Sequence, residues 1–413
     1  MFINAHCHVF NLQSVYTRGT MEMLRFRLEG TPLTEKAQRS IVNALEKVLQ
    51  GKRHTCIALV LAEIFGFDRY KEINFAKSMD VVADRLIKDS AKALPGEELV
   101  FAPLMMDILP KVMEDPAFLT NSFERQLERT QRQCLRHPGT FLPFVAVHSR
   151  RDQPVFPQGK DTLSLMKDAI MNGGFVGIKL YPTLGYEIEE LARCGAGDFF
   201  DFADRNQLPI TMHTNPEGSK MDAGFWAFCQ PDKWIPYLNR YPGLRINFAH
   251  YGGGYCFRSQ NGPDKPTHAQ WRFQIEKLMR DFPGRVFADV SYHDTALSRR
   301  TGGEYFNWLR SVLADEALAG QVLFGTDYPM QQAETSETRY IKAYKDALSA
   351  EDFRKITHDN PRRFLGLSTQ GGGHAANIQR HIDYLNGEKR LSERKDIWAK
   401  GSGPAAWVRE YLD

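Results

Sequence analysis

The sequence predicts an α/β fold: a (β/α)8 TIM barrel with a helical insertion after strand 1 and a C-terminal extension. Two observations predict it. Eight short apolar runs recur along the 413 residues, and stretches with helical spacing separate most of them. Runs that are apolar on both faces are typical of parallel strands, and strands that alternate with helices form βαβ units. Eight such units close into a barrel.

The predicted strands and helices follow one another in a regular order. The strands are expected at 2–6, 99–107, 141–148, 175–182, 208–214, 244–252, 286–293 and 322–329. Helical spacing is clearest in SFERQLERTQRQCL, DTLSLMKDAIM and WRFQIEKLMRDF. The turns HPGT, YPGL and FPGR precede three of the strands, as expected where a helix ends and a strand begins.

The predicted barrel occupies residues 1–367, with an insertion at 11–97 and an extension at 368–413. The apolar run CIALVLAEIF at 56–65 also fits a strand. We interpret it as helix, because the run at 99–107 lies at the correct distance before the next helix. An insertion after the first strand falls on the catalytic face of a barrel, so we expect a helical lid or wall there. The extension is expected to be a surface arm or an oligomer contact.

The charge and cysteine content narrow the classes of partner. Lys and Arg total 53 against 50 for Asp and Glu, a net charge of +3. Such a balance argues against nucleic acid or a membrane as the main partner. The expected partner is a small-molecule substrate, and a homodimer is possible. No apolar run approaches the roughly 18 residues of a membrane span, and the N-terminus does not resemble a signal peptide. Six widely spaced cysteines indicate reduced thiols, as in a cytoplasmic protein.

Two histidines on the first predicted strand are candidate metal ligands. His6 and His8 are two residues apart, so both side chains face the same side, which is the interior of a barrel. Cys7 points to the opposite face. Two imidazoles at the end of one strand supply half of a site for a first-row metal, although an HxH pair alone is weak evidence.

Three further candidates end later strands. His213 ends the fifth predicted strand, His250 the sixth and Asp327 the eighth. Each of them alone fits a core residue whose hydrogen bonds are satisfied. Together with the pair on strand 1 they stand at the carboxyl ends of four strands, where the active sites of barrels assemble. The set therefore favours a metal site.

The motifs around these residues resemble the amidohydrolase superfamily, in its amidohydrolase-related branch, which includes mononuclear enzymes similar to aminocarboxymuconate-semialdehyde decarboxylase. They occur in the family's order over 1–367 and read AHCHVF, GIKLYPTLGY, LPITMHT, YPGLRINFAHYGGG, LFGTDYP and NPRRFLGL. The insertion and the extension fall outside the resemblance. It implies a barrel that holds one divalent ion, usually Zn²⁺, with Mn²⁺ and Fe²⁺ as alternatives.

The resemblance also implies roles for the candidate residues. His6, His8, His213 and Asp327 are the expected metal ligands, and His250 is expected near the reacting group. A divalent ion lowers the pKa of a bound water toward about 7. Asp327 is then expected to accept the proton of that water, and His250 to polarise a carbonyl or to hold the water.

The predicted function is a metal-dependent hydrolase that acts on a small carboxylate, amide or lactone-like substrate. The alternative is a metal-dependent, non-oxidative decarboxylase of an aromatic or muconate-type acid. The residues do not decide between them; hydrolysis is preferred because most of the superfamily hydrolyses. A binding protein on an inactive barrel would be expected to lack at least one ligand, and all of them are present.

Three more residues at strand ends are expected to bind substrate: Lys179, Tyr181 and His293. The alternative for Lys179 is a carboxylated lysine that bridges two metals, as in binuclear members of the superfamily. Arginines in the following loops are further candidates for a carboxylate, because the guanidinium group forms paired hydrogen bonds. They are Arg150, Arg151, Arg258, Arg299 and Arg300.

Overall fold

All eight predicted strands are present. The computed structural model describes residues 1–11, 20, 22, 34–40, 43, 78–109, 116–152, 161–194, 198–216, 220–253, 271–368, 373–387, 401 and 403–412. The strands are β1 (Phe2–Cys7), β2 (Leu99–Pro103), β3 (Phe144–Val147), β4 (Gly177–Leu180), β5 (Pro209–His213), β6 (Arg245–Ala249), β7 (Val286–Asp289) and β8 (Val322–Leu323). Nearly all of their residues are buried, as expected for strands covered on both faces.

The strands form a (β/α)8 barrel in which β3 to β8 pair in sequence order and β1 pairs with β2, all in parallel. Two seams join these sheets. Phe101 bridges to Phe141 beside β2 and β3. At the other seam the Ala5 amide donates to the Phe324 carbonyl at 2.9 Å, and Cys7 bridges to Tyr328. The carboxyl ends of all eight strands therefore meet at one rim.

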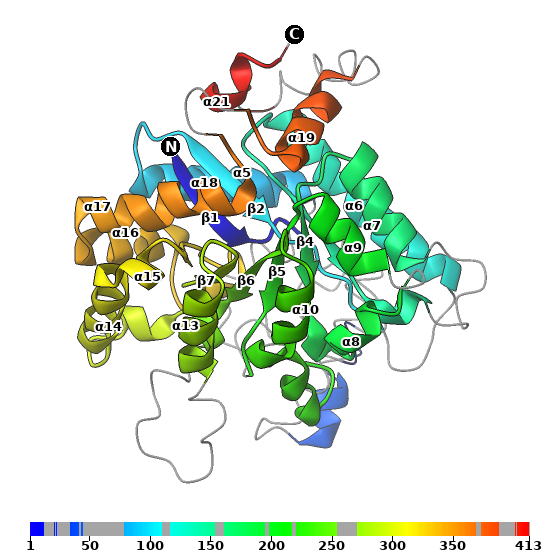
Figure 1. Cartoon of the computed structure of the whole chain (residues 1–413), viewed down its shortest axis with the longest axis horizontal. Coiled ribbons are helices and arrows are strands. Elements are labelled where there is room, and N and C mark those ends of the chain that lie inside the picture. The colour runs from blue at the N-terminus through cyan, green and yellow to red at the C-terminus, as the bar shows by residue number, and fades with distance from the viewer. Residues whose placement is uncertain are drawn as a thin grey trace.

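Helices surround the strands (Figure 1). The longer ones are α5 (Met79–Ala93), α6 (Pro116–Arg136), α7 (Thr162–Asn172), α9 (Asp198–Arg205), α10 (Ile235–Arg240), α13 (Trp271–Asp281), α14 (Gly302–Ala314), α16 (Glu337–Ala347), α18 (Asn360–Leu365) and α19 (Ala376–Asn386). Short helices are α8 (Ile188–Leu191), α15 (Glu316–Ala319), α17 (Ala350–Arg354) and α21 (Ala406–Arg409). In the described part of the chain, no helix combines the length and the apolar character needed to cross a bilayer.

Helix α5 lies at the end of the predicted insertion. Although it falls within 11–97, it lies between β1 and β2 in the chain and packs against α16 and α6, as a helix of the outer ring. The barrel's first helix therefore begins at Met79. The run at 56–65 and most of the predicted lid lie outside the described residues.

Two of the predicted helix-to-strand turns need the freedom of glycine. Gly139 in HPGT and Gly284 in FPGR have φ angles of +76° and +72°, in the left-handed region that residues with a Cβ rarely adopt. Each lies a few residues before a strand, β3 and β7 respectively. The turn prediction is confirmed at both places.

The described parts of the extension pack on the barrel. Asn377 and His381 of α19 donate hydrogen bonds to the carbonyls of Val176 and Gly174, just before β4, at 2.9 and 2.6 Å. The Trp407 indole donates to the Gly139 carbonyl at 2.7 Å. These contacts lie at the amino-terminal ends of the strands, so these parts cover the end opposite the rim where the carboxyl ends meet. Whether the extension is a surface arm or an oligomer contact stays a prediction.

A buried carboxyl group joins the outer helices to β8. Glu337 begins α16 and is fully buried; it accepts hydrogen bonds from Thr326 at 3.1 Å, from Ser90 at 3.2 Å and from Gln331. Burial raises the pKa of Glu337 to about 8, although the hydrogen bonds from Thr326 and Ser90 act in the opposite direction. The carboxyl is therefore protonated in the folded protein at neutral pH.

The raised pKa of Glu337 predicts that the free energy of unfolding depends on pH. The pKa of Glu337 is raised in the folded state, from 4.5 to about 8, so between these values the folded protein binds more protons than the unfolded chain. The contribution of Glu337 to the free energy of unfolding should therefore fall as pH rises through this window. Glu337→Gln, which is neutral at every pH, should have a flatter profile in urea unfolding. Profiles of equal slope would show that Glu337 is not the group that titrates.

Candidate metal centre

The two histidines of β1 are each held by a hydrogen bond on their outer side. Both are buried, and alternation along the strand turns them to the same face. The Nδ1 of His6 donates to Asp289 Oδ2 at 2.9 Å, and the Nδ1 of His8 donates to the Leu104 carbonyl at 2.6 Å. A neutral imidazole has one N–H, so the Nε2 of His8 presents a lone pair to the interior.

Asp327 completes this group from the loop after β8. Its Oδ1 lies 3.3 Å from His6 Nε2 and 3.1 Å from His8 Nε2. Donors bound to one tetrahedral zinc ion at about 2.0–2.1 Å lie about 3.3 Å from one another. Among the residues that the structure describes, His6, His8 and Asp327 are one of two buried sets of side chains whose ligand atoms are close enough to hold an ion. The backbone of Asp327 is left-handed, with φ of +58°.

His213 and His250 form a second pair of facing nitrogens. The Nε2 of His213 donates to the Asn215 carbonyl at 3.1 Å, and the Nδ1 of His250 donates to the Ser291 carbonyl at 3.2 Å. The remaining nitrogens, His213 Nδ1 and His250 Nε2, are 3.2 Å apart. When the rings are neutral, each of these two nitrogens carries a lone pair and no proton. The two atoms therefore cannot form a hydrogen bond with each other.

The pKa values explain why a cation suits this arrangement. Burial lowers the pKa of His8, of His213 and of His250, the last to about 3, so these rings stay neutral. Burial alone would raise the pKa of Asp327, but the neighbouring His6 acts in the opposite direction, and the pKa lies well below its usual range. The His8–Asp327 and His213–His250 contacts thus bring lone pairs and a carboxylate together, and a divalent cation relieves their repulsion.

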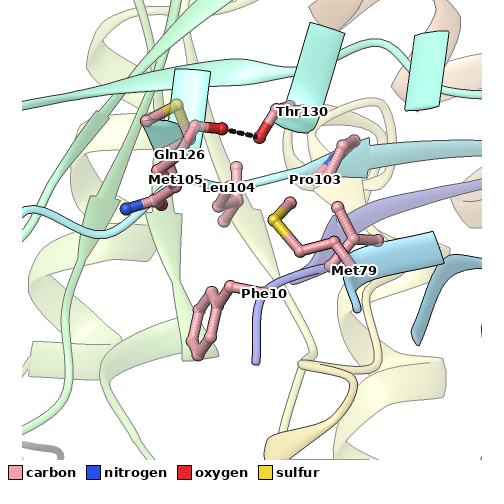
Figure 2. Close-up of a pocket in the computed structure, with 8 residues that line it drawn as sticks. Phe10, Met79, Pro103, Leu104, Met105, Gln126 and Thr130 are labelled. Atoms are coloured by element: carbon pink, nitrogen blue, oxygen red, sulfur yellow. Dashed lines mark hydrogen bonds between the residues drawn. The ribbon is translucent and has the colours of Figure 1, made fainter. Parts of the chain in front are cut away.

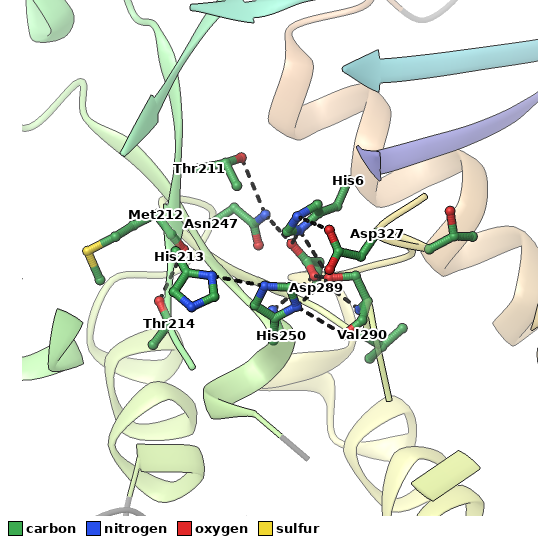
Figure 3. A network of polar contacts seen from close by, with 12 residues as sticks. His6, Thr211, Met212, His213, Thr214, Asn247, His250, Asp289, Val290 and Asp327 are labelled. Carbon is green, nitrogen blue, oxygen red and sulfur yellow. Dashed lines mark hydrogen bonds and ion pairs between the residues drawn. The ribbon is translucent and has the colours of Figure 1, made fainter. Parts of the chain in front are cut away.

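The residues present therefore fit a first-row divalent ion. Figure 3 shows His213 and His250 facing each other, with His6, Asp289 and Asp327 beside them. Of the four predicted ligands, His6, His8 and Asp327 come together in one set, and His213 reaches that set through His250. The exact ligand set stays a prediction.

Asp289 is the site residue that the sequence reasoning missed. It ends β7 and is fully buried, and it accepts hydrogen bonds from His6, from Asn247 at 2.7 Å and from the His250 amide at 3.0 Å. Carboxylates that bind the outer nitrogen of a ligating histidine fix its tautomer and orientation. With His6 and His250, Asp289 also forms the second set of candidate ligands. Its position at a strand end, in VFADVSYH, was the available signal.

Lys179 and Tyr181, both predicted to bind substrate, lie beside the histidines. The Tyr181 ring stacks on the His213 ring at 4.0 Å between centroids, and the Lys179 ammonium lies 5.3 Å from the centre of the Tyr181 ring. Burial lowers the pKa of Lys179 to about 8, while Asp327 and Asp289 act to raise it. Lys179 therefore supplies a largely protonated amine at neutral pH.

His293 does not turn its ring toward the site, although it was predicted to bind substrate. It is fully buried. Its Nδ1 lies 2.8 Å from the Tyr305 hydroxyl and its Nε2 lies 2.7 Å from the His250 carbonyl oxygen. Both ring nitrogens are thus used inside the protein, behind His250. Substrate binding by His293 has no support in this geometry.

Arg151 is also engaged inside the protein. Its guanidinium binds the Asp107 carboxylate through two hydrogen bonds, of 2.6 and 2.8 Å, and both side chains are buried. Of the other candidate arginines, Arg299 and Arg300 are exposed, and Arg258 lies outside the described residues. The Arg151–Asp107 pair ties the end of β2 to the loop after β3.

An apolar cluster lies among the loops that follow the strands. We call it the mouth cluster. It consists of Phe10, Met106, Ile108, Leu184 and Met221, with Tyr181, Phe225 and Met330 packed against it. Its members come from segments after β1, β2, β4, β5 and β8, and they are separate from the main core. Through Tyr181 the cluster reaches His213.

A small hollow lies between the ends of β1 and β2 and the helices α5 and α6 (Figure 2). Its lining residues are Val9, Phe10, Met79, Pro103, Leu104, Met105, Gln126 and Thr130. The polar groups in this lining are paired: Gln126 binds the Met106 backbone at 3.1 and 2.9 Å, and Thr130 donates to the Gln126 carbonyl at 2.8 Å. The hollow therefore offers packing space and no reactive group.

The chain matches a known protein family. A family model described as Amidohydrolase matches residues 91–367, about two thirds of the chain. No curated protein matches the chain.

Solved structures are similar in fold at low sequence identity. A probable 2-pyrone-4,6-dicarboxylic acid hydrolase from Acinetobacter baumannii, with citric acid bound, is 13% identical; the match covers 89% of this chain and 99% of that one, with a TM-score of 0.50. A 5-carboxyvanillate decarboxylase from Sphingomonas paucimobilis is 12% identical over the same shares, with a TM-score of 0.48. One from Novosphingobium aromaticivorans, complexed with manganese, is 17% identical over 80% and 93%, with a TM-score of 0.48.

Proposed function

Because the chain belongs to the amidohydrolase family, we propose that it is a metal-dependent hydrolase of a small carboxylate, amide or lactone-like substrate. One observation carries the metal dependence. The inner nitrogens of His8, His213 and His250 present lone pairs, and the Asp327 carboxylate lies 3.1 Å from that of His8. Such a set of neutral and anionic donors suits a cation and would be strained without one.

We assign His6, His8, His213 and Asp327 as ligands of one divalent ion. Three imidazoles and one carboxylate suit Zn²⁺, and Mn²⁺ or Fe²⁺ are the alternatives. When bound, such an ion acts as a Lewis acid and lowers the pKa of water from 15.7 toward about 7.

Two residues are proposed to handle the proton and the water. Asp327 is ionised, because its pKa is well below its usual range, so it accepts the proton of the attacking water and passes it to the leaving group. The inner nitrogen of His250, Nε2, carries a lone pair, because the proton of the ring lies on Nδ1 and is donated to the Ser291 carbonyl. His250 therefore accepts a hydrogen bond from the water. Polarising a carbonyl would need an N–H that this tautomer lacks.

The surroundings suggest the shape of the substrate. Lys179 lies against the Tyr181 ring, and the mouth cluster adds an apolar wall beside it. An ammonium group next to an apolar surface suits a small molecule with a carboxylate on an apolar or cyclic body. The fold is shared with a protein named as a probable 2-pyrone-4,6-dicarboxylic acid hydrolase, whose substrate class fits this description.

A second candidate function is non-oxidative decarboxylation of an aromatic or muconate-type acid. The apolar wall, in which Tyr181 and Phe225 pack against the mouth cluster, favours it, because it would also hold a planar ring. The two reactions differ in the bond that breaks. Hydrolysis adds the oxygen of water to the product, whereas decarboxylation releases CO₂ and adds a proton to carbon.

Isotope labelling separates the two. The metal-loaded protein is incubated with a panel of lactone dicarboxylates, aromatic acids and amides, once in water labelled with oxygen-18 and once in deuterium oxide. Hydrolysis should place one oxygen-18 atom in the product acid. Release of CO₂, together with one deuterium on carbon and no oxygen-18, would replace the hydrolase with the decarboxylase. Asp327→Asn, run in parallel, shows which products depend on the site.

A further inference from the structure

The backbone at His250 is held in an unfavourable conformation. Its φ angle is +62°, and that of the next residue, Tyr251, is +49°. Left-handed backbone is unfavourable for residues with a Cβ and persists only where the surroundings enforce it. Such outliers gather at functional sites, and this one aims the His250 ring at His213, 3.2 Å away.

Two buried side chains hold the two polar groups of this residue. The His250 amide donates to Asp289 Oδ1 at 3.0 Å, and the His250 carbonyl accepts from His293 Nε2 at 2.7 Å. The carbonyl also accepts from the Gly253 amide at 2.7 Å, which closes the turn that follows. His250 is thus clamped on its amide side by β7 and on its carbonyl side by His293.

The hydrogen bonds define the tautomer of His293. A carbonyl oxygen only accepts, so Nε2 carries the proton and donates. The Nδ1 of the neutral ring then accepts from the Tyr305 hydroxyl, 2.8 Å away. Only this tautomer satisfies both partners at once.

Three buried tyrosines hold His293 in turn. The Tyr305 hydroxyl, from α14, lies 2.7 Å from the Tyr344 hydroxyl of α16. Tyr340, also on α16, donates to the Val290 carbonyl at 2.6 Å and accepts from the His293 amide at 3.1 Å. The outer helices are therefore connected through His293 to the backbone of a residue in the metal centre.

We infer that His293 is a positioning residue that fixes the left-handed backbone of His250 and so aims the His250 ring at the metal centre. This inference rests on the metal site proposed above. It assigns His293 no contact with substrate. It predicts that the loss of the Nε2 donor changes how the site binds a metal ion.

The experiment uses the full chain, with its metal removed by a chelator. Zn²⁺ affinity is measured by competition with a chromophoric chelator, and the visible spectrum is recorded with Co²⁺. Because the His250 ring faces the assigned ligand His213 at 3.2 Å, His293→Leu should disturb that ligand. It should lower Zn²⁺ affinity by about 10–100-fold, the usual effect of losing a residue that supports a metal ligand, and should shift the Co²⁺ bands. His293→Gln should recover most of the affinity and the wild-type bands, because its side-chain amide can donate from the position of Nε2.

His381→Leu is the matched control. His381 is equally buried and donates to a backbone carbonyl, that of Gly174 at 2.6 Å, but at the opposite end of the barrel. It should lose stability while its Zn²⁺ affinity and Co²⁺ spectrum stay those of the wild type. An equal loss of affinity in His381→Leu would overturn the inference, because the effect would then be one of general stability.

The remaining outcomes are also decisive. If His293→Leu binds Zn²⁺ as tightly as the wild type with unchanged Co²⁺ bands, the positioning role is wrong and the metal site stands. If the wild type binds neither ion, the proposed function fails together with the inference. If His293→Leu does not fold, Tyr305→Phe decides, since it removes only the hydroxyl at Nδ1. It should shift the Co²⁺ bands in the same direction, and an unchanged spectrum would overturn the role.

Discussion

Asp327→Asn is expected to lower turnover by at least about 10²-fold while the protein keeps most of its metal, because a residue that transfers a proton contributes on this scale. The substitution removes the base but leaves an amide oxygen beside His6 and His8, whose Nε2 atoms lie 3.3 and 3.1 Å from Oδ1. Turnover is measured on whichever substrate the isotope screen identifies. Metal content is measured on the same sample.

Asp289→Asn is the matched comparison, because it also neutralises a buried carboxylate of the site. Asp289 orients His6 from outside the ligand set assigned above, so its loss should lower metal affinity by about 10–100-fold and leave turnover at saturating metal less affected. The two carboxylates thus separate into a proton acceptor and an orienting group. Near wild-type turnover in Asp327→Asn would falsify the assignment of Asp327 as the base.

His8→Ala is expected to abolish tight metal binding. The wild type, freed of metal and then given Zn²⁺ at about 1,000 times the dissociation constant, should gain about 4 kcal/mol in its free energy of unfolding. His8→Ala should gain little at the same Zn²⁺ concentration, because one of the inner nitrogens is lost. The gain is read from urea unfolding with and without the ion.

His148→Ala is the control for this measurement. His148 is a buried histidine just after β3, at the same rim of the barrel, and it belongs to neither set of candidate ligands among the described residues. It should keep the full gain on adding Zn²⁺. A full gain in His8→Ala would exclude His8 as a ligand.

Much of the fold and part of the site follow from local patterns. Eight apolar runs led to the eight strands, because strands covered on both faces must be apolar throughout. The carboxyl ends of parallel strands meet at one rim, so His6, His8, His213, His250 and Asp327 were expected together. The limits of the insertion do not follow from local pattern in the same way. A helix such as α5 has the same pattern in a lid as in the outer ring, and its packing on α16 places it in the outer ring.

What the sequence by itself determined is which side chains reach the rim: the alternation of β1 turns His6 and His8 inward, and the strand ends bring the other ligands near. Only the tertiary structure decided what each ring does there. His6 is oriented by Asp289, 283 residues away, and His8 by the Leu104 carbonyl, 96 residues away. His293, like His250, stands near the end of a predicted strand. The His293 ring nevertheless lies behind the site, where its Nδ1 contacts the Tyr305 hydroxyl. Tautomer and ring direction depend on such distant partners, and no local pattern encodes them.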